Sequence, residues 1–583
     1  MLDFRNVNTL WASVLVETWR RLGLAMAVVC PGSRSTPLTV ALARHLDIIT
    51  IPVLDERSAS FFALGLAKKA HQPVILVSTS GTAAANFYPA IIEAHHSQVP
   101  LLVLTADRPP EARACRAGQA IDQHKLFGDY PNWQQELALP EAEIPQLKYA
   151  RQVAAQAWEQ SLYPQRGAVH LNCPFREPLS PIPQMAISRL RGALEANPFW
   201  THLQPGSPQG FVMPPAEIPF ERWQSGVRGL IVVGLEHPLH PERYAQQVAM
   251  LARQLQWPVL ADGVSPIRNY QSLNPWLITT YDCLLRRNDL RSRLAPELVI
   301  QIGDLPTSKE LRSWLESVEP TRWIVSPTSV NSDPLHGPTV HLRLSLGQLV
   351  NWASRQPSVN TEVLQQDYLK QWLSLQNTAN QEINRRCQRE SRLMEPKIAW
   401  GLSQWLPAET RLFVANSMSV RQVEWFWQLN DHKIQPFCNR GANGIDGTLS
   451  TALGIAYGGA SVALVGDLAL LHDTNGFLIS PHFEGHLTLV VVNNKGGGIF
   501  EQLPIAGFDP PFEKYFATPQ RVELDSLAAA YGVEYQLISN WSQLKELITQ
   551  LPERGIRLLE IPCDRKYDAR WLKTNLPEFG IVP

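Results

Sequence analysis

Two turns in the last third of the chain carry residues that suit a divalent cation and a phosphate. Asp467 follows an apolar stretch, and Asn494 follows the next apolar stretch along the chain. A hard cation such as Mg²⁺ takes oxygen ligands and commonly keeps phosphate oxygens in its shell. Asp467 offers a carboxylate, Asn494 a side-chain carbonyl and Gly496 a backbone carbonyl. Because ligands bind at the carboxyl ends of parallel strands, we expect these three groups to lie together.

Glycines surround this candidate metal site. Residues 496–498 are three consecutive glycines, which would let the backbone wrap a phosphate and place Ile499 and Phe500 beside it. Residues 439–447 form a second glycine-dense loop that leads into a helix of small residues. Glycine allows close approach of the backbone to a ligand, so both segments are candidates for contact with a small molecule.

A carboxylate with two possible roles lies near the start of the chain. Glu56 comes just after the apolar stretch 51–54 and opens an apolar helix. A glutamate in the first helical turn is favoured by the helix dipole and needs no further role. A carboxylate that follows a strand in an α/β protein is equally suited to proton transfer. The local pattern alone leaves both interpretations open.

The elements that would position these residues are strands alternating with helices, which predicts parallel sheets. A proline-rich passage from Pro178 to Pro219 cannot be a continuous helix or a central strand and is interpreted as a linker. A polar helix is expected over 363–390. The expected strands cover 24–30, 51–54, 73–78 and 100–105 in a first block, 229–234, 258–261, 298–302, 323–326 and 339–344 in a middle block, and 412–415, 462–465, 487–492 and 558–561 in a last block.

Composition excludes several classes of function. The chain has 583 residues, enough for several domains, and a net charge of -1 gives no electrostatic footprint for nucleic acid or for an anionic membrane. We find no apolar run of the ~18 residues that a membrane span needs, and no signal-peptide pattern at the start. The seven cysteines have no metal-ligand spacing, so reduced thiols and a cytoplasmic location are expected.

Six segments, taken together and in order, resemble the MenD family of thiamine-diphosphate enzymes, the 2-succinyl-5-enolpyruvyl-6-hydroxy-3-cyclohexene-1-carboxylate synthases. The resemblance spans nearly the whole chain. It implies a three-domain α/β fold: residues 1–185 would bind the aminopyrimidine, 186–355 would form a central domain that includes the proline-rich linker, and 356–583 would bind diphosphate and Mg²⁺. The segments are 30–38, 55–62, 79–86, 105–111, 439–447 and 466–498.

The resemblance also implies the reaction. The cofactors would be thiamine diphosphate and Mg²⁺, with Mn²⁺ as an alternative. The enzyme would decarboxylate 2-oxoglutarate and add the resulting succinyl carbanion in 1,4 fashion to isochorismate, in menaquinone or phylloquinone biosynthesis. Glu56 would lie next to N1′ of the aminopyrimidine and promote formation of the cofactor's nucleophile.

The family's motifs assign further residues. Four arginines and a lysine would suit two substrates that together carry four carboxylates, since the arginine fork matches a carboxylate. Glu56, Arg34, Gln119, Arg421 and Arg440 are the expected catalytic residues. The substrate set is Ser33, Arg34, Arg108, Gln119, Lys309, Ser417, Arg421 and Arg440. The cofactor set is Glu56, Gly81, Ser417, Ile445, Gly466, Asp467, Asn494, Gly496, Ile499, Phe500 and Leu503.

The sequence departs from the family pattern at two places. Glu310 follows Lys309 where relatives can carry a second basic residue, and Ala469 stands where a serine hydroxyl facing diphosphate is common. Loss of one such hydrogen bond typically costs ~1 kcal/mol. The resemblance further implies that Glu56 and Asp467 serve one cofactor from two chains, so a homodimer or a dimer of dimers is expected.

Two other functions compete with this one. An acetohydroxyacid synthase or another thiamine-diphosphate-dependent 2-oxoacid decarboxylase would share the cofactor motifs, but its substrates carry fewer carboxylates than the arginine set suits. A non-catalytic nucleotide-binding module is the alternative from a different class. It is disfavoured because no Gly-x-Gly-x-x-Gly segment follows a strand and opens a helix with a suitable acidic residue downstream.

Overall fold

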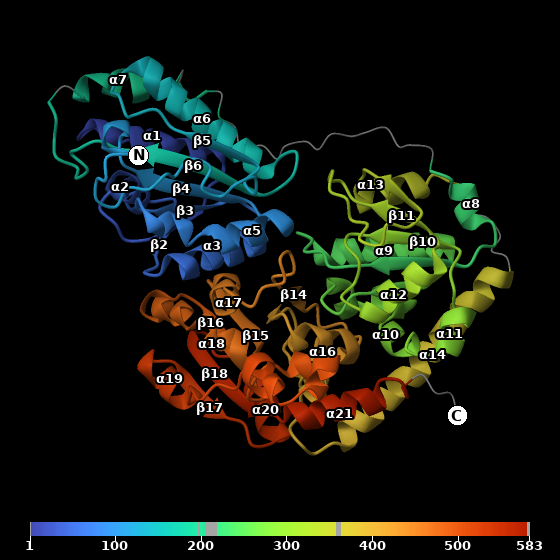
Figure 1. The fold of residues 1–583 in the computed structure, drawn as a ribbon. Coiled ribbons are helices and arrows are strands. Elements are labelled where there is room, and N and C mark those ends of the chain that lie inside the picture. The colour runs from blue at the N-terminus through green and yellow to red at the C-terminus, as the bar shows by residue number, and fades with distance from the viewer. Residues whose placement is uncertain are drawn as a thin grey trace. The chain divides into compact units, whose positions relative to one another are not determined.

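The computed structural model describes residues 2–185, 187–195, 199–201, 203, 218–356 and 363–579. Within these ranges the chain forms three sheets, each with six parallel strands and helices packed around it (Figure 1). The prediction of an α/β fold with three mostly parallel sheets is therefore confirmed. The domain boundaries at 185 and 355 stay predictions.

The first sheet has the strand order β2-β1-β3-β4-β6-β5. All seven residues of β4 are buried, as expected of a central parallel strand covered on both faces. The helices that belong to this part of the chain are α1 (Val7–Leu22), α2 (Thr36–Ala43), α3 (Glu56–Ala70), α4 (Thr82–Ala85), α5 (Tyr88–His96) and α6 (Ile144–Leu162). The strands are β1 (Met26–Val29), β2 (Ile49–Pro52), β3 (Val74–Ser78), β4 (Leu101–Asp107), β5 (Trp133–Glu136) and β6 (Ala168–Pro174).

The second sheet has the order β12-β11-β10-β7-β8-β9. Its strands are β7 (Gly229–Val233), β8 (Val259–Ala261), β9 (Leu277–Ile278), β10 (Leu298–Ile302), β11 (Thr321–Val325) and β12 (Thr339–Leu342). The main helices around it are α9 (Pro241–Leu255), α10 (Tyr281–Leu284), α11 (Asn288–Arg293), α12 (Lys309–Val318) and α13 (Leu346–Ala353).

The third sheet has the order β14-β13-β15-β16-β18-β17. Its strands are β13 (Arg411–Val414), β14 (Gln435–Phe437), β15 (Ala460–Gly466), β16 (His486–Asn493), β17 (Glu534–Leu537) and β18 (Gly555–Pro562). The helices in this part of the chain are α14 (Val363–Arg389), α15 (Glu395–Trp405), α16 (Met418–Phe426), α17 (Thr448–Ala456), α18 (Asp467–Leu471), α19 (Leu524–Ala530), α20 (Trp541–Thr549) and α21 (Arg565–Asn575).

Five described strands were not predicted from the sequence. One of them, β6, is seven residues long, buried and internal to its sheet, and the sequence analysis missed it. The other four, β5, β9, β14 and β17, lie at sheet edges and are short or polar. β5 is partly exposed along its length, and β17 is mostly exposed, so neither has the apolar run that marks a buried strand. β14 and β9 are three and two residues long. The polar helix expected over 363–390 is confirmed as α14. In the proline-rich passage, the described part holds the short helix α7 (Arg191–Glu195), and residues 204–217 lie outside the described ranges.

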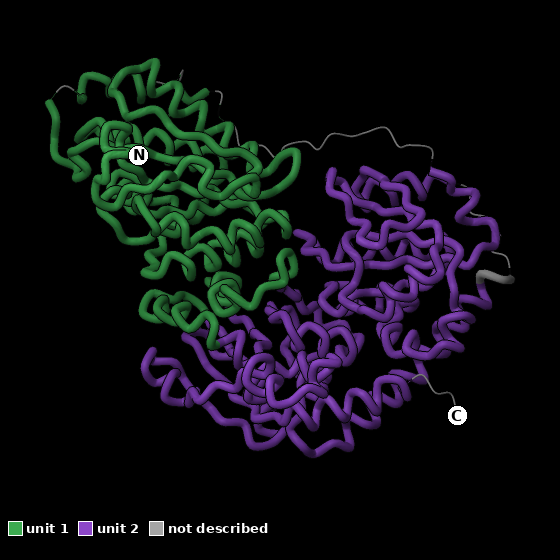
Figure 2. The backbone as a smooth tube through the Cα atoms, in the orientation of Figure 1, with its two compact units in different colours: residues 1–210, 439–458, 471–485 green, residues 211–438, 459–470, 486–583 purple. Residues whose placement is uncertain are grey.

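The chain divides into two compact units that do not follow the order of the sequence (Figure 2). Unit 1 contains residues 1–210 together with 439–458 and 471–485. Unit 2 contains 211–438, 459–470 and 486–583. Two segments of the last block, including the predicted glycine-dense loop 439–447, are therefore part of the first compact unit.

Among the described residues, a large apolar cluster lies in unit 1 and two further clusters lie in unit 2. In unit 1, α3 packs directly against α17 with glycines at the contact. A Cβ atom added to Gly454 would lie 2.2 Å from the carbonyl oxygen of Phe62, and one added to Gly65 would lie 2.2 Å from that of Thr451. No helix in the described ranges is long and apolar enough to cross a membrane.

Candidate active site

The two turns predicted to hold a cation lie side by side in unit 2. β15 and β16 are adjacent parallel strands, with Gly466 in register with Val492, so Asp467 and Asn494 follow neighbouring strand ends. The Asp467 carboxylate accepts a 2.8 Å hydrogen bond from the backbone N–H of Leu468 and another of 2.8 Å from that of Gly496. The second bond joins the two turns directly.

Asn494 is oriented by a residue that the sequence analysis did not select. Its Nδ2 donates a 2.5 Å hydrogen bond to Oε1 of Glu395, the first residue of α15. Its Oδ1 is buried and has no hydrogen-bond partner among the described residues. A buried carbonyl oxygen without a donor is costly unless a ligand satisfies it, and a hard cation does so. The residues present therefore fit Mg²⁺.

Acidic side chains surround this position. Burial raises the pKa of Asp467 to about 6, and burial also raises the pKa of Glu395, with the charge of Asp467 adding to the effect. Asp568 accepts a hydrogen bond of 3.2 Å from the backbone N–H of Glu395, and its pKa is raised by burial and by the Glu395 charge. A divalent cation would be the largest local positive charge and would favour the ionised form of these carboxylates.

The backbone completes the cation site. Gly496 has φ of 133°, a conformation that favours glycine, and a Cβ there would lie 2.3 Å from the carbonyl oxygen of Ala517. Its own carbonyl accepts a 2.9 Å hydrogen bond from the N–H of Gly498, which leaves one lone pair for a ligand. Ala469, which replaces the expected hydroxyl, is buried on α18 beside this turn.

The apolar residues of the predicted cofactor set follow these glycines. Ile499 is partly buried against the core of unit 2. Phe500 pairs edge-on with Phe516, with ring centroids 5.9 Å apart, and Leu503 is 46% exposed. Leu503 therefore has surface available for a ligand, while Ile499 also has a packing role.

Ser417 and Arg421 are brought together at the start of α16. Ser417 has φ of 65°, which is uncommon for a residue with a side chain, and Arg421 donates a 2.6 Å hydrogen bond to its carbonyl oxygen. Strained backbone of this kind is concentrated at functional sites. The position fits the expectation that these two residues bind ligand.

Lys309 is the exposed first residue of α12, and Ser308 caps the helix through a 3.1 Å bond from the N–H of Leu311. Glu310, the unusual residue beside it, lies 3.4 Å from Arg291 and 3.9 Å from Arg286. The carboxylate is thus held by two arginines of its own unit. These two contacts explain how the structure accommodates a carboxylate at position 310.

Glu56 begins α3 in unit 1, directly after its N-cap Asp55. Its side chain is half-buried, and the charges of Glu56 and Asp55 add to burial in raising the pKa of Cys30. A cavity of about 410 Å³ opens at the ends of β1 and β2, lined by Cys30, Val53 and residues around them. This volume lies in the range of small-molecule pockets.

The first-block substrate residues gather at the carboxyl ends of β1, β3 and β4, which are neighbours in the sheet. Arg34 is 12% exposed, donates a 2.9 Å hydrogen bond to the carbonyl oxygen of Phe175, and lies 3.5 Å from Glu177. Burial and the charge of Arg108 lower the pKa of Arg34, so the two guanidinium groups lie in one region. Such a pair of cations suits a ligand with several carboxylates.

Arg108, Gln119 and Gly81 form a connected group. Arg108 donates hydrogen bonds of 3.2 and 3.0 Å to the carbonyl oxygen of Gly118, and Gln119 donates one of 3.0 Å to that of Ser80. Gly81 has φ of 85°, and a Cβ there would lie 3.0 Å from Cγ of Gln119. Ser33 is exposed on the turn after β1.

The loop that carries Arg440 and Ile445 is anchored by a buried glutamate on α5. Glu93 accepts hydrogen bonds from the backbone N–H groups of Gly441 at 3.1 Å and Ala442 at 2.7 Å. The fully buried ammonium of Lys68 lies 3.3 Å from Glu93 and donates a 2.9 Å bond to Asn439. The predicted cofactor-bending loop is thus attached to the helices of the first block.

The structure places the predicted residues in two sets. The unit 1 set holds Ser33, Arg34, Glu56, Gly81, Arg108, Gln119, Arg440 and Ile445. The unit 2 set holds Lys309, Ser417, Arg421, Gly466, Asp467, Asn494, Gly496, Ile499, Phe500 and Leu503.

Sequence reasoning missed the polar residues that orient these sets. Asn172 interrupts the apolar strand β6, and Glu93 interrupts the apolar face of α5. A polar residue within a buried apolar run is the signal that could have found them. Glu395 gave no such signal, because it resembles an ordinary first-turn glutamate before a proline.

Comparisons with known proteins show which family the sequence resembles. The sequence model described as "Thiamine pyrophosphate enzyme, N-terminal TPP binding domain" matches residues 11–126, and "Middle domain of thiamine pyrophosphate" matches 195–414. Among similar proteins, each named 2-succinyl-5-enolpyruvyl-6-hydroxy-3-cyclohexene-1-carboxylate synthase, that of Gloeothece citriformis is 56% identical over 100% of both chains. That of Rippkaea orientalis is 55% identical over 99% of this chain and 98% of its own, and that of Microcystis aeruginosa is 54% identical over 98% and 99%.

Proposed function

The chain belongs to the family of 2-succinyl-5-enolpyruvyl-6-hydroxy-3-cyclohexene-1-carboxylate synthases, thiamine-pyrophosphate enzymes, and from this premise we propose how its residues perform the reaction. The enzyme decarboxylates 2-oxoglutarate and transfers the succinyl group to isochorismate, a step of menaquinone or phylloquinone biosynthesis. The observation that carries the proposal is the pair of turns at Asp467 and Asn494. There the buried side-chain oxygen of Asn494 has no hydrogen-bond partner among the described residues.

Asp467, Asn494 and Gly496 would hold Mg²⁺, with Mn²⁺ as an alternative, through their oxygen atoms. The glycines that follow would let the backbone approach the diphosphate, and the bond from Asn494 to Glu395 fixes the orientation of the Asn494 amide. When bound, thiamine diphosphate supplies the electron sink that lets a 2-oxoacid lose CO₂ and react at its former carbonyl carbon.

Glu56 holds and moves a proton at N1′ of the aminopyrimidine. Its half-buried place at the start of α3, two residues after Leu54, which lines the open cavity at the ends of β1 and β2, supports this role. Ile445 would impose the bent shape of the cofactor, Ile499, Phe500 and Leu503 would line the wall of its site, and Gly81 would contact it.

The cationic residues neutralise the substrate carboxylates. Arg34 and Arg108 bind isochorismate, and Gln119 orients it through its side-chain amide. Arg421 and Arg440, together with Ser417 and Lys309, bind the remaining carboxylates. The electrostatic coupling of Arg34 to Arg108 and the bond between Arg421 and Ser417 support this division.

The enzyme acts as a homodimer or a dimer of dimers, in which Glu56 of one chain and Asp467 of another serve one cofactor. We place it in the cytoplasm, because its seven cysteines are all free thiols. A monomer with full activity would contradict the shared site.

A two-substrate assay tests the function. We expect the absorbance of isochorismate to fall only when 2-oxoglutarate, thiamine diphosphate and Mg²⁺ are all present, and removal of the metal with a chelator to stop the reaction. Loss of isochorismate without 2-oxoglutarate would contradict the synthase. Carboligation of pyruvate without isochorismate would instead favour an acetohydroxyacid synthase.

A further inference from the structure

A buried side-chain amide joins three segments of unit 1 behind the predicted substrate residues. Gln123 is fully buried although it lies in the loop between β4 and β5. Its Oε1 accepts a 2.9 Å hydrogen bond from the backbone N–H of Gly81, and its Nε2 donates to Oδ1 of Asn172 at 2.9 Å and to the carbonyl oxygen of Ala106 at 3.3 Å. One amide thus connects the ends of β3, β4 and β6.

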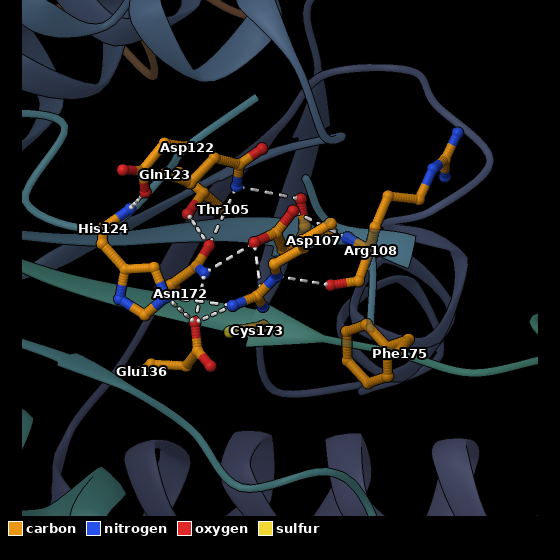
Figure 3. A network of polar contacts seen from close by, with 12 residues as sticks. Thr105, Asp107, Arg108, Asp122, Gln123, His124, Glu136, Asn172, Cys173 and Phe175 are labelled. Atoms are coloured by element: carbon orange, nitrogen blue, oxygen red, sulfur yellow. Dashed lines mark hydrogen bonds and ion pairs between the residues drawn. The ribbon is translucent and has the colours of Figure 1, made fainter. Parts of the chain in front are cut away.

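Asn172 in turn fixes which way this amide points. Its Oδ1 also accepts a 2.9 Å bond from the hydroxyl of Thr105, and its Nδ2 donates to Asp107 at 2.8 Å and to Glu136 at 3.0 Å (Figure 3). With acceptors on its nitrogen side and donors on its oxygen side, Asn172 has one favourable orientation. Gln123 must therefore present its nitrogen to Asn172 and its oxygen to Gly81.

Arg113 balances the charge of this network. Its guanidinium lies 3.0 Å from Asp107 and 2.7 Å from Glu136, and its Nε donates a 3.1 Å bond to the carbonyl oxygen of Arg108. The network therefore contacts the backbone of a predicted substrate residue, while the Arg108 side chain points away from it in Figure 3.

The loop that Gln123 anchors has strained backbone at Gln119, a predicted substrate residue. Gln119, four positions earlier, has φ of 58°. Two other residues of the loop also have positive φ, Ala114 at 55° and Arg116 at 58°. Such conformations cost of order 1 kcal/mol each and persist only when the surroundings impose them. Among the bonds that anchor this loop, that of Gln119 to Ser80 and that of Gln123 to Gly81 join it to the end of β3.

We propose that Gln123 is a positioning residue, whose buried amide holds the loop bearing Gln119 and Arg108 in register with Gly81. This inference rests on the proposed function, since it takes Gln119 and Arg108 as isochorismate-binding residues. Gln123 itself need not touch a substrate. Its effect on the reaction is exerted through the loop.

The test replaces the amide by a carboxylate of the same shape, Gln123→Glu. The variant still accepts the bond from Gly81, but it loses both donors to Asn172 and Ala106 when ionised and keeps at most one of them when protonated. We expect kcat/KM for isochorismate to fall by at least about ten-fold, because small misplacements of binding groups have large effects, while the decarboxylation of 2-oxoglutarate changes by less than about three-fold.

A spin label gives a readout that needs no turnover. Cys115 lies exposed in the same loop, whereas five of the other cysteines are buried and Cys563 is half-buried. We expect a nitroxide on Cys115 to become more mobile in Gln123→Glu than in the wild type. A Cys115→Ser protein supplies the background signal.

Two further variants complete the test. Gln135→Glu makes the same change on β5, where the side chain donates to the Tyr149 hydroxyl at 3.0 Å, and should alter neither readout. Asn172→Ala should likewise lower kcat/KM for isochorismate more than the decarboxylation of 2-oxoglutarate, and it should make the spin label more mobile. Its effects should be non-additive with those of Gln123→Glu, because both residues act through one hydrogen-bond chain.

The outcomes separate the two proposals. An unchanged spectrum and an unchanged preference for isochorismate in Gln123→Glu would overturn the positioning role. If that variant fails to fold, the same two unchanged readouts in Asn172→Ala would overturn it. A mobile label in a protein that never consumes isochorismate would instead refute the proposed function and leave the anchoring of the loop supported.

Discussion

At the scale of residues, Glu56 and Asn494 show how position converts ordinary side chains into candidate reactive groups. Glu56 occupies the first turn of a helix, where any carboxylate would be favoured. What distinguishes it is the cavity and the buried Cys30 thiol beside it. Asn494 is distinguished by its buried Oδ1, which has no hydrogen-bond partner within the described ranges, and its amide is oriented by the bond to Glu395.

The role of Glu56 can be tested by Gln replacement. Glu56→Gln keeps the shape but cannot exchange a proton with N1′, so we expect exchange of the cofactor's C2 proton to slow by roughly 10²–10⁴-fold, the usual range for a general acid–base group. Deuterium exchange at C2, followed by acid quench and NMR, measures this rate directly. Glu159→Gln, at an exposed position on α6, serves as the control. Exchange at the wild-type rate would remove Glu56 from its assigned role.

The sequence was sufficient to select the groups expected to contact ligands, but not the groups that orient them. Asp467 and Asn494 were selected because strand, turn and residue type agree. Glu395 and Gln123 were not, because each acts through a partner far along the chain: Glu395 through Asn494, and Gln123 through Asn172. Such partnerships depend on tertiary packing, which local patterns do not encode.

At the scale of elements, the packing of α3 on α17 connects two predicted parts of the site. α3 begins at Glu56, and α17 follows the loop that carries Arg440 and Ile445. The two helices approach closely through Gly65 and Gly454, where a Cβ on either side would meet backbone of the other helix at 2.2 Å. The sequence predicted a helix of small residues after the glycine-dense loop, and in unit 1 this helix packs on α3.

This contact predicts that Gly454→Ala destabilises the protein. Alanine has a higher helix propensity than glycine by about 1 kcal/mol, so the substitution would stabilise an isolated helix. Here the added methyl group meets the carbonyl oxygen of Phe62, which is backbone and cannot move aside cheaply. We expect a loss on the order of 1–3 kcal/mol, as for other overpacked sites, seen as a lower midpoint of thermal unfolding.

Gly192 provides the matched control for this substitution. It lies in the helix α7 of the same unit, and an added Cβ would meet no atom within 4 Å. Gly192→Ala should therefore leave the midpoint unchanged or raise it. Equal midpoints for the two variants would show that the contact between α3 and α17 does not limit stability.

Elements differ in how well the sequence predicts them. Central strands such as β4 and β16 are continuous apolar runs and were expected close to their observed positions. β5 and β17 are edge strands, so each has a neighbouring strand on one side only. Their side chains are mostly polar, so their sequences resemble those of loops. Their existence depends on the neighbouring strand β6 or β18 rather than on their own residues.

At the scale of the whole molecule, buried polar groups link segments that are far apart in the sequence. In unit 2, Glu424 on α16 accepts hydrogen bonds from the backbone N–H of Gly263 and from the hydroxyl of Tyr281. Asp262, beside Gly263, accepts a 2.6 Å bond from the N–H of Thr307, two residues before Lys309. The helix that carries Arg421 and the loop that leads to Lys309 are thus fastened to the same turn of the second sheet.

This linkage makes the stability of unit 2 depend on pH. Burial, with the nearby charge of Asp262, raises the pKa of Glu424 to about 8, although Arg268 lies 3.5 Å away. An unfolded glutamate has a pKa of about 4.3, so between these values the folded chain binds a proton that the unfolded chain releases. Rising pH therefore favours unfolding across this window, by up to about 1.4 kcal/mol per pH unit, and the effect levels off above pH 8.

Glu424→Gln removes this titration while keeping an amide that can bond Gly263 and Tyr281. We expect the thermal midpoint of the variant minus that of the wild type to increase as the pH rises from 5 to about 8. Only the wild type loses stability through this group, because its folded form binds a proton that its unfolded form releases. Glu546→Gln, at an exposed position on α20, should run parallel to the wild type over the same range. A Glu424→Gln curve parallel to the wild type would mean that Glu424 is ionised in the folded protein. The turn at Asp262 and Gly263 would then be held by an ion pair with Arg268 rather than by a neutral, hydrogen-bonded carboxyl group.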